Sequence, residues 1–433
     1  MANIRPLRAW RYNEHLLKNI DQLTSPLFDV ISPKQREVLY KNELNSIHLS
    51  VPAGAEPIEN AGETLKNWKN SGVLVQDQLP GIYVYYQYFS LPGSEHERVR
   101  KGFISNLLLH DWEDNIVLRH ENTMPYSVND RRDLLAETEL NVSPTHGLYT
   151  DPEKEIENYL DESMKAPLYE TEDYQGVRDV FSVIHDAKII KRIIEIIKGK
   201  QIILADGHHR YEGSLAYKKL MSSKNPNHKG DEAYNYHMMY FTNTESDNLR
   251  ILPTHRVING IKSLNESDLL NKLSEDFIIK PIENPGDVNE VILGKKWAFG
   301  LLIGENAYKI RLNPEKISEL NWNIPDVIKE LDLTVLHYFV IEKVLGIPGK
   351  EQRDARELRF EPNFSECLRE VIKEEAQMAF ITKGISIDTI KKVCYSGYTL
   401  PQKSTYFYPK VISGFLFSSI NEDEFYSGFD SSF

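Results

Sequence analysis

The stretch Gln201-Ile202-Ile203-Leu204-Ala205-Asp206-Gly207-His208-His209-Arg210-Tyr211-Glu212-Gly213 carries the strongest structural signal in the chain. The run from Ile202 to Ala205 is apolar throughout and predicts a short buried strand. Asp206-Gly207 predicts a sharp turn, because glycine adopts backbone conformations that other residues avoid. Residues 211–220 then have the apolar spacing of a helix.

A strand, a glycine turn and a helix point free backbone N–H groups at an anion. His208, His209 and Arg210 add cationic side chains to the same place. An aspartate-glycine pair before a helix is often only a turn, and a single buried histidine is often a core residue. The density of polar groups after an apolar strand favours the functional interpretation, so we take this turn as the candidate site.

Length and composition limit the class of protein. A chain of 433 residues is long enough for two or three domains, and 41% hydrophobic and 27% charged residues are typical of a soluble globular protein. The net charge of −13 argues against a general nucleic-acid binder but permits a local basic pocket. The chain has two cysteines, Cys367 and Cys394, so we expect neither a disulfide framework nor a thiolate zinc site.

No apolar run is long enough to cross a bilayer, and the first residues lack the hydrophobic region of a signal peptide. We therefore expect no membrane partner and a cytoplasmic location.

Alternation of strand-like and helix-like segments predicts a mixed α/β (α+β) fold. The segment from Phe28 predicts a strand end running into a helix with Ser32 as its N-cap, and Ile47 to Val51 predicts a strand. Single helices are expected over residues 327–345 and 360–375, and a peripheral helix within 151–173. We expect four parts: an N-terminal part of the core at 1–150, a central part at 151–260, an accessory insertion at 261–325 and a C-terminal part at 326–433.

A second polar cluster runs from Leu118 to Thr123. A carboxylate beside a histidine, here Glu121 beside His120, with basic residues such as Arg131 downstream, is what a general base with charged substrate neighbours requires. A solvated helix start has a similar composition, so both interpretations stay open.

The third cluster is Lys403-Ser404-Thr405, which offers an ammonium and two hydroxyls, all suited to phosphate. Its spacing does not match a glycine-rich phosphate loop. We expect these residues to fold back against the turn from Asp206 to Arg210 and to complete one pocket. The alternative is an edge strand with polar residues facing solvent.

Five blocks together resemble the prokaryotic family of unknown function numbered 1015, in the family's order over essentially the whole chain. They are Arg5-Pro6, Phe28 to Ser32, Arg119 to Thr123, Ala205 to Arg210, and Pro401 to Lys410.

The segment from Asp206 to Tyr211 is also similar to a motif of the ParB-like free serine kinases, which phosphorylate L-serine with ATP or ADP. This resemblance implies a ParB/sulfiredoxin-like core with inserted and C-terminal subdomains. It also implies that His208, His209 and Arg210 contact nucleotide phosphates and that Asp206 holds Mg²⁺ or the substrate hydroxyl.

The same kinases need an upstream catalytic glutamate, for which Glu121 is the candidate by type and order. We take its neighbours His120 and Thr123, together with Arg131, as candidate substrate contacts, and Lys403, Ser404 and Thr405 as further nucleotide contacts. The insertion after residue 260 and the C-terminal block have no counterpart in those kinases.

The leading hypothesis is a nucleotide-dependent small-molecule kinase, acting on a free amino acid hydroxyl such as that of L-serine. One alternative is a metal-dependent hydrolase in which His120, Asp206, His208 and His209 bind a transition metal. Adjacent histidines rarely aim at one ion, which ranks it second. Another is a ParB-like nucleotide-binding regulator without small-molecule chemistry. The oligomeric state stays open.

Overall fold

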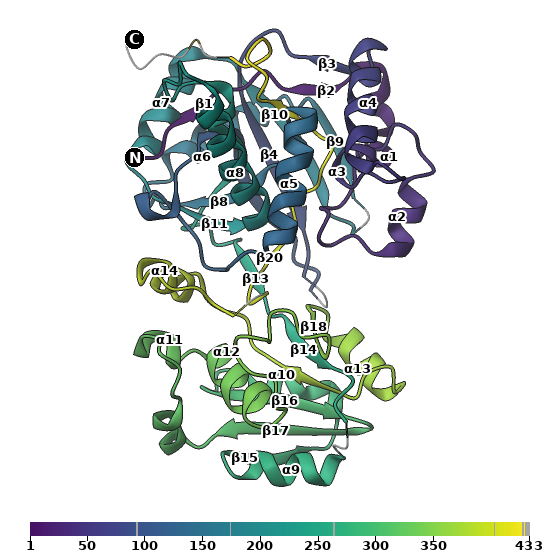
Figure 1. The fold of residues 1–433 in the computed structure, drawn as a ribbon, viewed down its shortest axis with the longest axis vertical. Helices are drawn as coiled ribbons and strands as arrows, with labels where there is room; N and C mark the ends of the chain where they lie inside the picture. Colours follow the sequence, from purple (N-terminus) through teal and green to yellow (C-terminus); the bar gives the residue numbers. More distant parts are fainter. Residues whose placement is uncertain (92–93, 174, 263–264, 402, 427, 429–433) are drawn as a thin grey trace. The chain divides into compact units, whose positions relative to one another are not determined.

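The computed structural model describes residues 1–433 except 92–93, 174, 263–264, 402, 427 and 429–433, and the chain divides into two compact units (Figure 1). Unit 1 comprises Met1–Arg119, Thr123–Leu249 and Pro409–Phe433. Unit 2 comprises His120–Asn122 and Arg250–Tyr408. The short segment His120–Asn122 thus belongs to unit 2, although unit 1 includes the residues on both sides of it.

Unit 1 is organised on a nine-stranded sheet in the order β6-β11-β8-β12-β5-β4-β10-β9, with β1 paired to β5. Pairs β6–β11 and β8–β12 are parallel, and the other pairs are antiparallel. The strands of unit 1 are β1 Ile4–Arg5, β2 Trp10–Tyr12, β3 Leu74–Gln76, β4 Ile82–Phe89, β5 Arg98–Leu108, β6 Val117–Leu118, β7 Leu140–Asn141, β8 Thr145–Tyr149, β9 Tyr169–Glu172, β10 Arg178–Ile184, β11 Ile202–Asp206, β12 Tyr236–Asn243 and β21 Ser418–Ser419.

The large sheet is buried on both faces because successive side chains of a strand point to opposite sides. In β4, Ile82 and Val84 join a core shared with α6, α7 and α8, whereas Tyr83 and Tyr85 join a second core shared with α4 and the C-terminal segment. The helices of unit 1 are α1 Ile20–Leu23, α2 Pro33–Leu39, α3 Ile47–Ser50, α4 Pro57–Asn70, α5 Pro125–Thr138, α6 Glu155–Ser163, α7 Ala187–Lys198 and α8 His208–Lys224.

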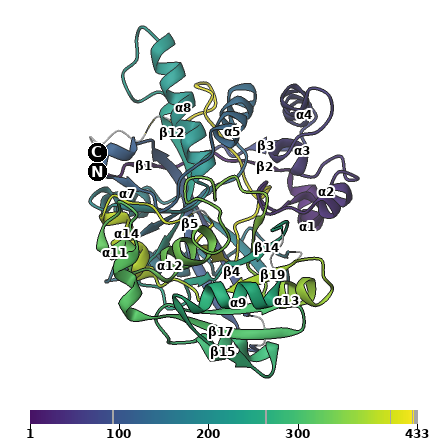
Figure 2. The same cartoon turned by 60° about the horizontal axis from the view of Figure 1, so that its bottom comes forward.

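Unit 2 contains a six-stranded antiparallel sheet in the order β15-β17-β16-β19-β14-β18, seen from a second direction in Figure 2. One face packs on α9 and a π-helix, and the other packs on α10 and α13. Gly300 in β16 is needed for this packing, because a Cβ there would lie 2.1 Å from Val288 Cγ1 on α10.

The strands of unit 2 are β13 Arg250–Leu252, β14 His255–Ile258, β15 Phe277–Ile282, β16 Ala298–Ile303, β17 Asn306–Leu312, β18 Leu358–Glu361, β19 Met378–Ile381 and β20 Tyr406–Tyr408. Its helices are α9 Glu266–Ser274, α10 Val288–Ile292, α11 Asp326–Lys329, α12 Asp332–Val335, the π-helix Leu336–Glu342, α13 Phe364–Ile372 and α14 Ile387–Tyr395. Strand β13 pairs with β20 in a separate two-stranded sheet.

The mixed α/β class predicted from the sequence is confirmed, whereas the finer ParB/sulfiredoxin-like assignment and the four-part division stay predictions. The N-cap predicted at Ser32 is confirmed, since its side chain and that of Gln35 form a reciprocal capping box. Two strand predictions were wrong. Residues 28–30 form a turn, and Ile47–Ser50 is a helix because the Asn45 side chain accepts a hydrogen bond from the Ile47 N–H and starts a turn.

Three helix predictions were also too long. Residues 327–345 are divided among α11, α12 and the π-helix, because Leu331 is extended before Asp332 accepts a hydrogen bond from Trp297 N. Phe360 belongs to β18, and the helix begins only after the N-cap Asn363. Within 151–173 the helix α6 is followed by the strand β9.

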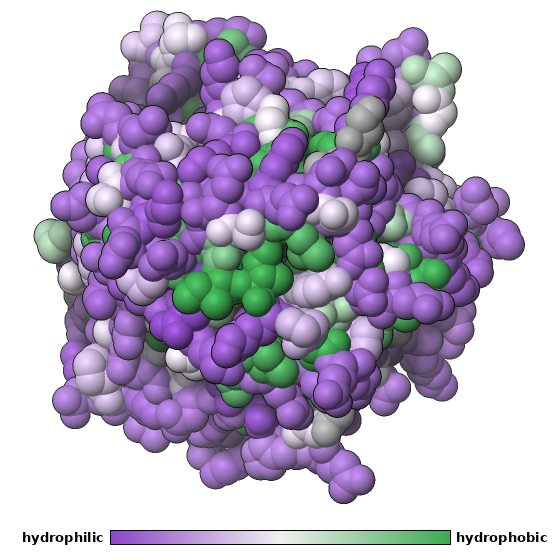
Figure 3. Space-filling model, turned by 90° about the horizontal axis from the view of Figure 1, so that it is seen from below, coloured by the Kyte–Doolittle hydropathy of each residue, from purple (hydrophilic) through white to green (hydrophobic). Residues whose placement is uncertain are grey.

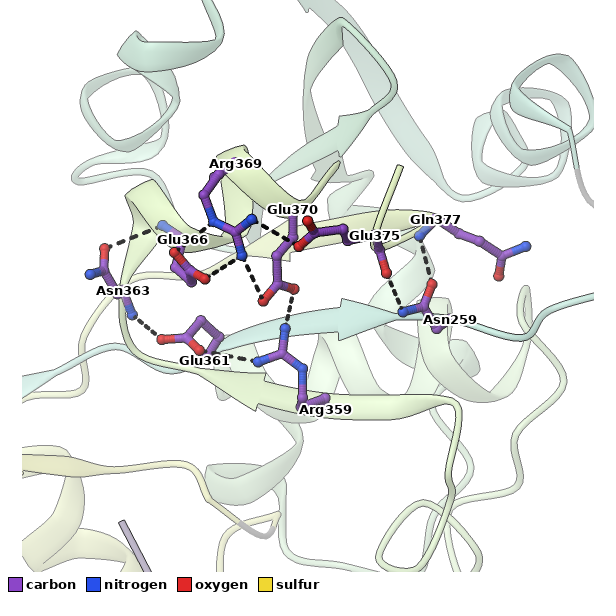
Figure 4. A network of polar contacts seen from close by, with 9 residues as sticks. All are labelled: Asn259, Arg359, Glu361, Asn363, Glu366, Arg369, Glu370, Glu375 and Gln377. Atoms are coloured by element: carbon purple, nitrogen blue, oxygen red, sulfur yellow. Dashed lines mark hydrogen bonds and ion pairs between the residues drawn. The ribbon is translucent and has the colours of Figure 1, made fainter. Parts of the chain in front are cut away.

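Ion pairs and hydrogen bonds connect β18, α13 and the adjoining loops on the surface of unit 2 (Figure 4). Arg359 pairs with Glu361 and Glu370, and Arg369 pairs with Glu366, Glu370 and Glu375. Exposed pairs of this kind contribute little individually, so the network is a minor source of stability.

The face in Figure 3 is mainly hydrophilic, with hydrophobic side chains in a central group and in smaller groups around it. Among the described residues no helix has the length and apolar character needed to span a bilayer.

Candidate functional site

Asp206 ends strand β11, and it is placed there by an irregular sheet register. The pairing of β11 with β8 shifts between Leu204 and Asp206, so that Asp206 lies opposite His146. Such irregularities redirect side chains at the ends of strands and are frequent near active sites. The carboxylate is largely buried, with 13% of the side chain exposed.

Gly207 connects the strand to helix α8 and has a φ of +91°, a conformation that residues with a side chain rarely adopt. A Cβ at this position would also lie 2.6 Å from Thr145 Cγ2 and 2.9 Å from Arg210 Nη2. Both the backbone angle and the close packing therefore require glycine.

Helix α8 begins at His208, three residues before the start expected from the sequence. The two histidines and Arg210 consequently occupy the first helical turn and not a loop. The expectation missed this because Gly207 serves as the N-cap without any side-chain hydrogen bond, and side-chain caps are the usual sequence signal. The first-turn N–H groups of α8 lack partners within the helix.

Two cations hold the Asp206 carboxylate. Arg210 Nη2 lies 3.0 Å from Asp206 Oδ2, and Lys410 Nζ forms a close ion pair with Asp206 Oδ1. All three side chains are at most 13% exposed. A carboxylate in such surroundings is fixed in position, and the local charge is net positive.

Lys410 is the residue of this group that sequence reasoning missed. It ends the block from Pro401 to Lys410, but the phosphate chemistry was assigned to Lys403, Ser404 and Thr405. Only the return of the C-terminal segment into unit 1 brings Lys410 to Asp206.

The Arg210 guanidinium donates hydrogen bonds to three groups of the protein. Nη1 donates to Ser143 Oγ at 2.9 Å and to the Pro144 carbonyl at 2.7 Å, while Nη2 donates to Asp206. Burial lowers the pKa of Arg210, an effect opposed by the negative charges of Asp206 and Asp29. Arg210 is therefore placed to orient Asp206.

His209 and Glu212 fasten α8 to the segment that precedes α5. The Met124 N–H donates to His209 Nε2 at 3.0 Å, and Thr123 Oγ1 donates to Glu212 Oε2 at 2.5 Å. A neutral His209 must therefore have its proton on Nδ1. His208, at the first position of α8, is buried.

Arg131 lies on α5, where its side chain is well fixed. Nη1 donates to the Ser50 carbonyl at 2.7 Å, Nε donates to Asp130 Oδ2 at 2.8 Å, and the guanidinium stacks 4.5 Å above the Phe28 ring. These contacts tie α5 to the N-terminal segment of unit 1, and a role in substrate binding stays a prediction.

The second and third sequence clusters meet in unit 2. Thr405 Oγ1 lies 2.8 Å from His120 Nε2, and Glu121 Oε1 accepts from the N–H groups of Ser404 and Thr405 at 3.0 and 3.3 Å. The Leu400 N–H donates to the His120 carbonyl at 2.7 Å. Segments far apart in the chain thus form one polar cluster, since Glu121 and Ser404 are separated by 283 residues.

The remaining groups of this cluster are also engaged. The Ser404 hydroxyl donates to the Pro401 carbonyl, and the Lys403 carbonyl accepts from Thr254 Oγ1. Lys403 has a φ of +53°, an uncommon angle for a residue with a side chain. The structure thus groups His120, Glu121 and Lys403–Thr405 in unit 2. It groups Thr123, Arg131 and residues 206–210 in unit 1, and the single pocket expected from the sequence stays a prediction.

A metal ion was expected on Asp206. Among the described residues no three His, Cys, Asp or Glu side chains are grouped so that they could hold one ion. Each oxygen of Asp206 already pairs with a cation, so this carboxylate by itself is a poor Mg²⁺ ligand.

The family described as a protein of unknown function, DUF1015, matches residues 4–334. The chain belongs to this family. Membership confirms the resemblance to this family, and it assigns no activity. The blocks from Arg5 to Arg210 lie within the matched residues, whereas the block from Pro401 to Lys410 lies beyond them. No curated protein matches the chain.

Several solved structures match this chain at low sequence identity. A free serine kinase in complex with AMP is 12% identical over 67% of this chain and 83% of its own, with a TM-score of 0.35. A variant of the free serine kinase in complex with ADP is 12% identical over 67% and 84%, with a TM-score of 0.34. A C-terminal truncation of SbnI from Staphylococcus aureus is 11% identical over 69% and 80%, with a TM-score of 0.32. Likenesses at this level carry no functional argument.

Proposed function

We propose that this protein transfers a phosphoryl group from a nucleotide, ATP or ADP, to a hydroxyl of a small molecule. One observation carries the proposal: a carboxylate at the end of a buried strand is held by Lys410 and Arg210 directly before an uncapped helix N-terminus. Phosphoryl transfer depends chiefly on positioning and on offsetting charge, and this arrangement suits both tasks.

The phosphates would lie at the N-terminus of α8. The first N–H groups of a helix point outward there, and the helix dipole favours negative charge. Gly207 permits close approach of an anion, and Lys410 and His208 supply cationic or donating side chains beside it. Arg210 acts as a positioning residue, because its guanidinium donates hydrogen bonds to Asp206, Ser143 and Pro144.

In the reaction, the acceptor hydroxyl oxygen bonds to the terminal phosphorus while the bond from that phosphorus to the bridging oxygen breaks. The electron pair leaves with the shortened nucleotide, and the hydroxyl proton passes to a carboxylate. Asp206 and Glu121 are the candidates for this base. Lys410 offsets the charge that develops on the transferred group.

Mg²⁺ would enter with the nucleotide, held mainly by its phosphates, and would neutralise part of their charge. The residues of this chain bind the phosphates, orient the carboxylate and keep water from the transferred group.

The acceptor is proposed to be a free amino acid hydroxyl such as that of L-serine. His120, Thr123 and Arg131 remain proposed substrate contacts, and Lys403, Ser404 and Thr405 remain proposed nucleotide contacts. Hydrogen bonds within each unit fix the positions of His120, Thr123, Arg131 and Thr405, which suits specific recognition.

The test combines binding with product detection. Calorimetry should detect ATP or ADP binding that strengthens with Mg²⁺, and phosphorus NMR should detect a new phosphomonoester when L-serine or another hydroxyl compound is added. Absence of binding to ATP, ADP and CTP at millimolar nucleotide would reject the proposal. Binding without product over a broad panel of acceptors would favour the nucleotide-binding regulator instead.

A further inference from the structure

Unit 2 contains a cavity of about 320 Å³ that is unrelated to the Asp206 group. Small-molecule sites in proteins commonly have volumes of 300 Å³ or more. Its wall includes Thr334 of α12 and His337 of the π-helix, and further lining residues are Asn122, Gly349, Lys350, Gln352, Arg353 and residues 399–401. All of these residues belong to unit 2.

Two buried polar atoms of the cavity lining have no hydrogen-bond partner among the described residues. One is Thr334 Oγ1, on a side chain only 1% exposed, and the other is Arg353 Nη2. A buried donor or acceptor without a partner is costly, so native proteins rarely keep one without a reason. A bound ligand with an acceptor group would satisfy both atoms.

The charge of the lining indicates the kind of ligand. Lys350 and Arg353 line the cavity, and no carboxylate occurs among the described lining residues. Apolar side chains form much of the remaining wall, including those of Trp322, Phe360 and Leu400. This combination fits an anion that has an apolar body.

The wall is held in place before any ligand binds. Trp322 Nε1 donates to both carboxylate oxygens of Glu342 at 3.3 and 3.2 Å, and the Gly349 N–H donates to the same carboxylate. A Cβ on Gly349 would lie 2.6 Å from Trp322 Cζ2, so glycine is needed for the indole to lie there. Glu342 ends the π-helix, a conformation that is frequent at functional sites.

His337 also lines the cavity, but its ring is committed to a buried chain of hydrogen bonds. Arg256 Nε donates to His337 Nε2 at 3.1 Å, and His337 Nδ1 lies 2.7 Å from Gln352 Oε1. Burial and the Arg256 charge lower the pKa of His337 to about 3, so the ring stays neutral. His337 is thus a wall residue, and the ligand-binding groups are Thr334 and Arg353.

We propose that this cavity binds a small carboxylate with an aromatic or aliphatic body, the carboxylate meeting Arg353 and Thr334 and the body lying against Trp322. This site goes beyond the proposed phosphoryl transfer. Its argument uses neither a nucleotide nor Asp206, although Asn122 and Pro401 of its wall lie within two residues of the proposed functional residues Glu121 and Lys403 in the chain.

The test uses the full-length protein labelled with 5-fluorotryptophan. The chain has 5 tryptophans, and Trp322→Phe assigns the fluorine resonance of Trp322. The probes are naphthalene-1-acetate and its neutral amide. We expect the acid to shift the Trp322 resonance with saturation at millimolar concentration or below, and the amide to bind at least tenfold more weakly.

Two pairs of variants complete the test. Arg353→Gln should remove the preference for the acid, whereas the exposed Arg356→Gln should retain it. Thr334→Val should weaken binding of naphthalene-1-acetate without lowering the melting temperature, because the Thr334 hydroxyl has no hydrogen-bond partner to lose among the described residues. Thr138→Val is the matched stability control and should lower it, since Thr138 Oγ1 donates to the Leu134 carbonyl at 2.7 Å.

Equal binding of acid and amide, no shift of the Trp322 resonance with either, or equal binding by the Arg353 and Arg356 variants would each overturn the proposal. These outcomes are measured without nucleotide, so they leave the phosphoryl-transfer proposal to its own test.

Discussion

Asp206 and Lys410 are 204 residues apart in the chain, yet their side chains form a close ion pair in unit 1. Arg210 holds the other oxygen of the same carboxylate, and Gly207 separates the carboxylate from the start of α8. The candidate site is thereby a fixed pairing of charges beside a helix N-terminus, and the C-terminal segment contributes Lys410 to it.

We expect Lys410→Met to weaken nucleotide binding or turnover at least tenfold, which corresponds to about 1.4 kcal/mol. The free energy of unfolding should fall by roughly 1–3 kcal/mol, since a largely buried carboxylate loses a charged partner but keeps Arg210. Calorimetry and urea denaturation measure the two effects.

Lys219→Met is the matched control for Lys410. Lys219 lies on α8 with 66% of its side chain exposed and pairs with Asp111 at the surface, so stability should change by no more than about 0.5 kcal/mol. If Lys410→Met behaved like this control while Lys403→Ala abolished binding, the nucleotide site would move to Lys403–Thr405.

Gly207→Ala should destabilise the protein, because it places a side chain at φ +91° and drives a Cβ toward Thr145. We expect a loss of about 1–3 kcal/mol in urea denaturation. Gly199→Ala, at the end of α7, is the control: its φ is −89° and nothing lies within 4 Å of the added Cβ. It should be neutral or stabilising by up to about 1 kcal/mol, and equal losses in both variants would contradict the explanation.

Stability should depend on pH through Asp179, a fully buried residue of β10. Burial raises the pKa of Asp179 to about 8, an effect opposed by hydrogen bonds from Tyr85 and Gln87. The folded state therefore keeps a proton that the unfolded chain releases near its ordinary pKa of about 3.9. The stability contributed by this proton is complete below about pH 4 and is lost as the pH rises to about 8.

Asp179→Asn removes this titration but keeps an oxygen that accepts from Tyr85 and Gln87. Urea denaturation at several pH values between about 4 and 8 should give a flatter stability profile for the variant. A profile parallel to that of the unmodified protein would mean that Asp179 is ionised in the folded state.

We expect the protein to purify without stoichiometric zinc, manganese or iron. Consecutive histidine side chains diverge, and His209 Nε2 already accepts a hydrogen bond from Met124 N. Elemental analysis of the unmodified protein and of His208→Ala tests this. A stoichiometric transition metal that is lost in His208→Ala would favour the hydrolase over the kinase.

Local structure in this protein could be predicted from the order of residues alone. The apolar run before Asp206 is a strand, Gly207 is the turn, and Ser32 caps its helix, because each depends on residues within one or two turns of chain. The prediction failed where short-range hydrogen bonds opposed the apolar pattern, as at Asn45, where a turn replaces the expected strand.

Contacts between side chains far apart in the chain became visible only in the folded protein. No periodicity places Lys410 on Asp206, or Ser404 and Thr405 on Glu121. The chain passes from unit 1 to unit 2 at His120–Asn122 and again at Arg250–Tyr408. Polar residues from separate segments therefore meet within one unit. The number of possible pairings between separate segments is large, and local sequence patterns do not select one of them.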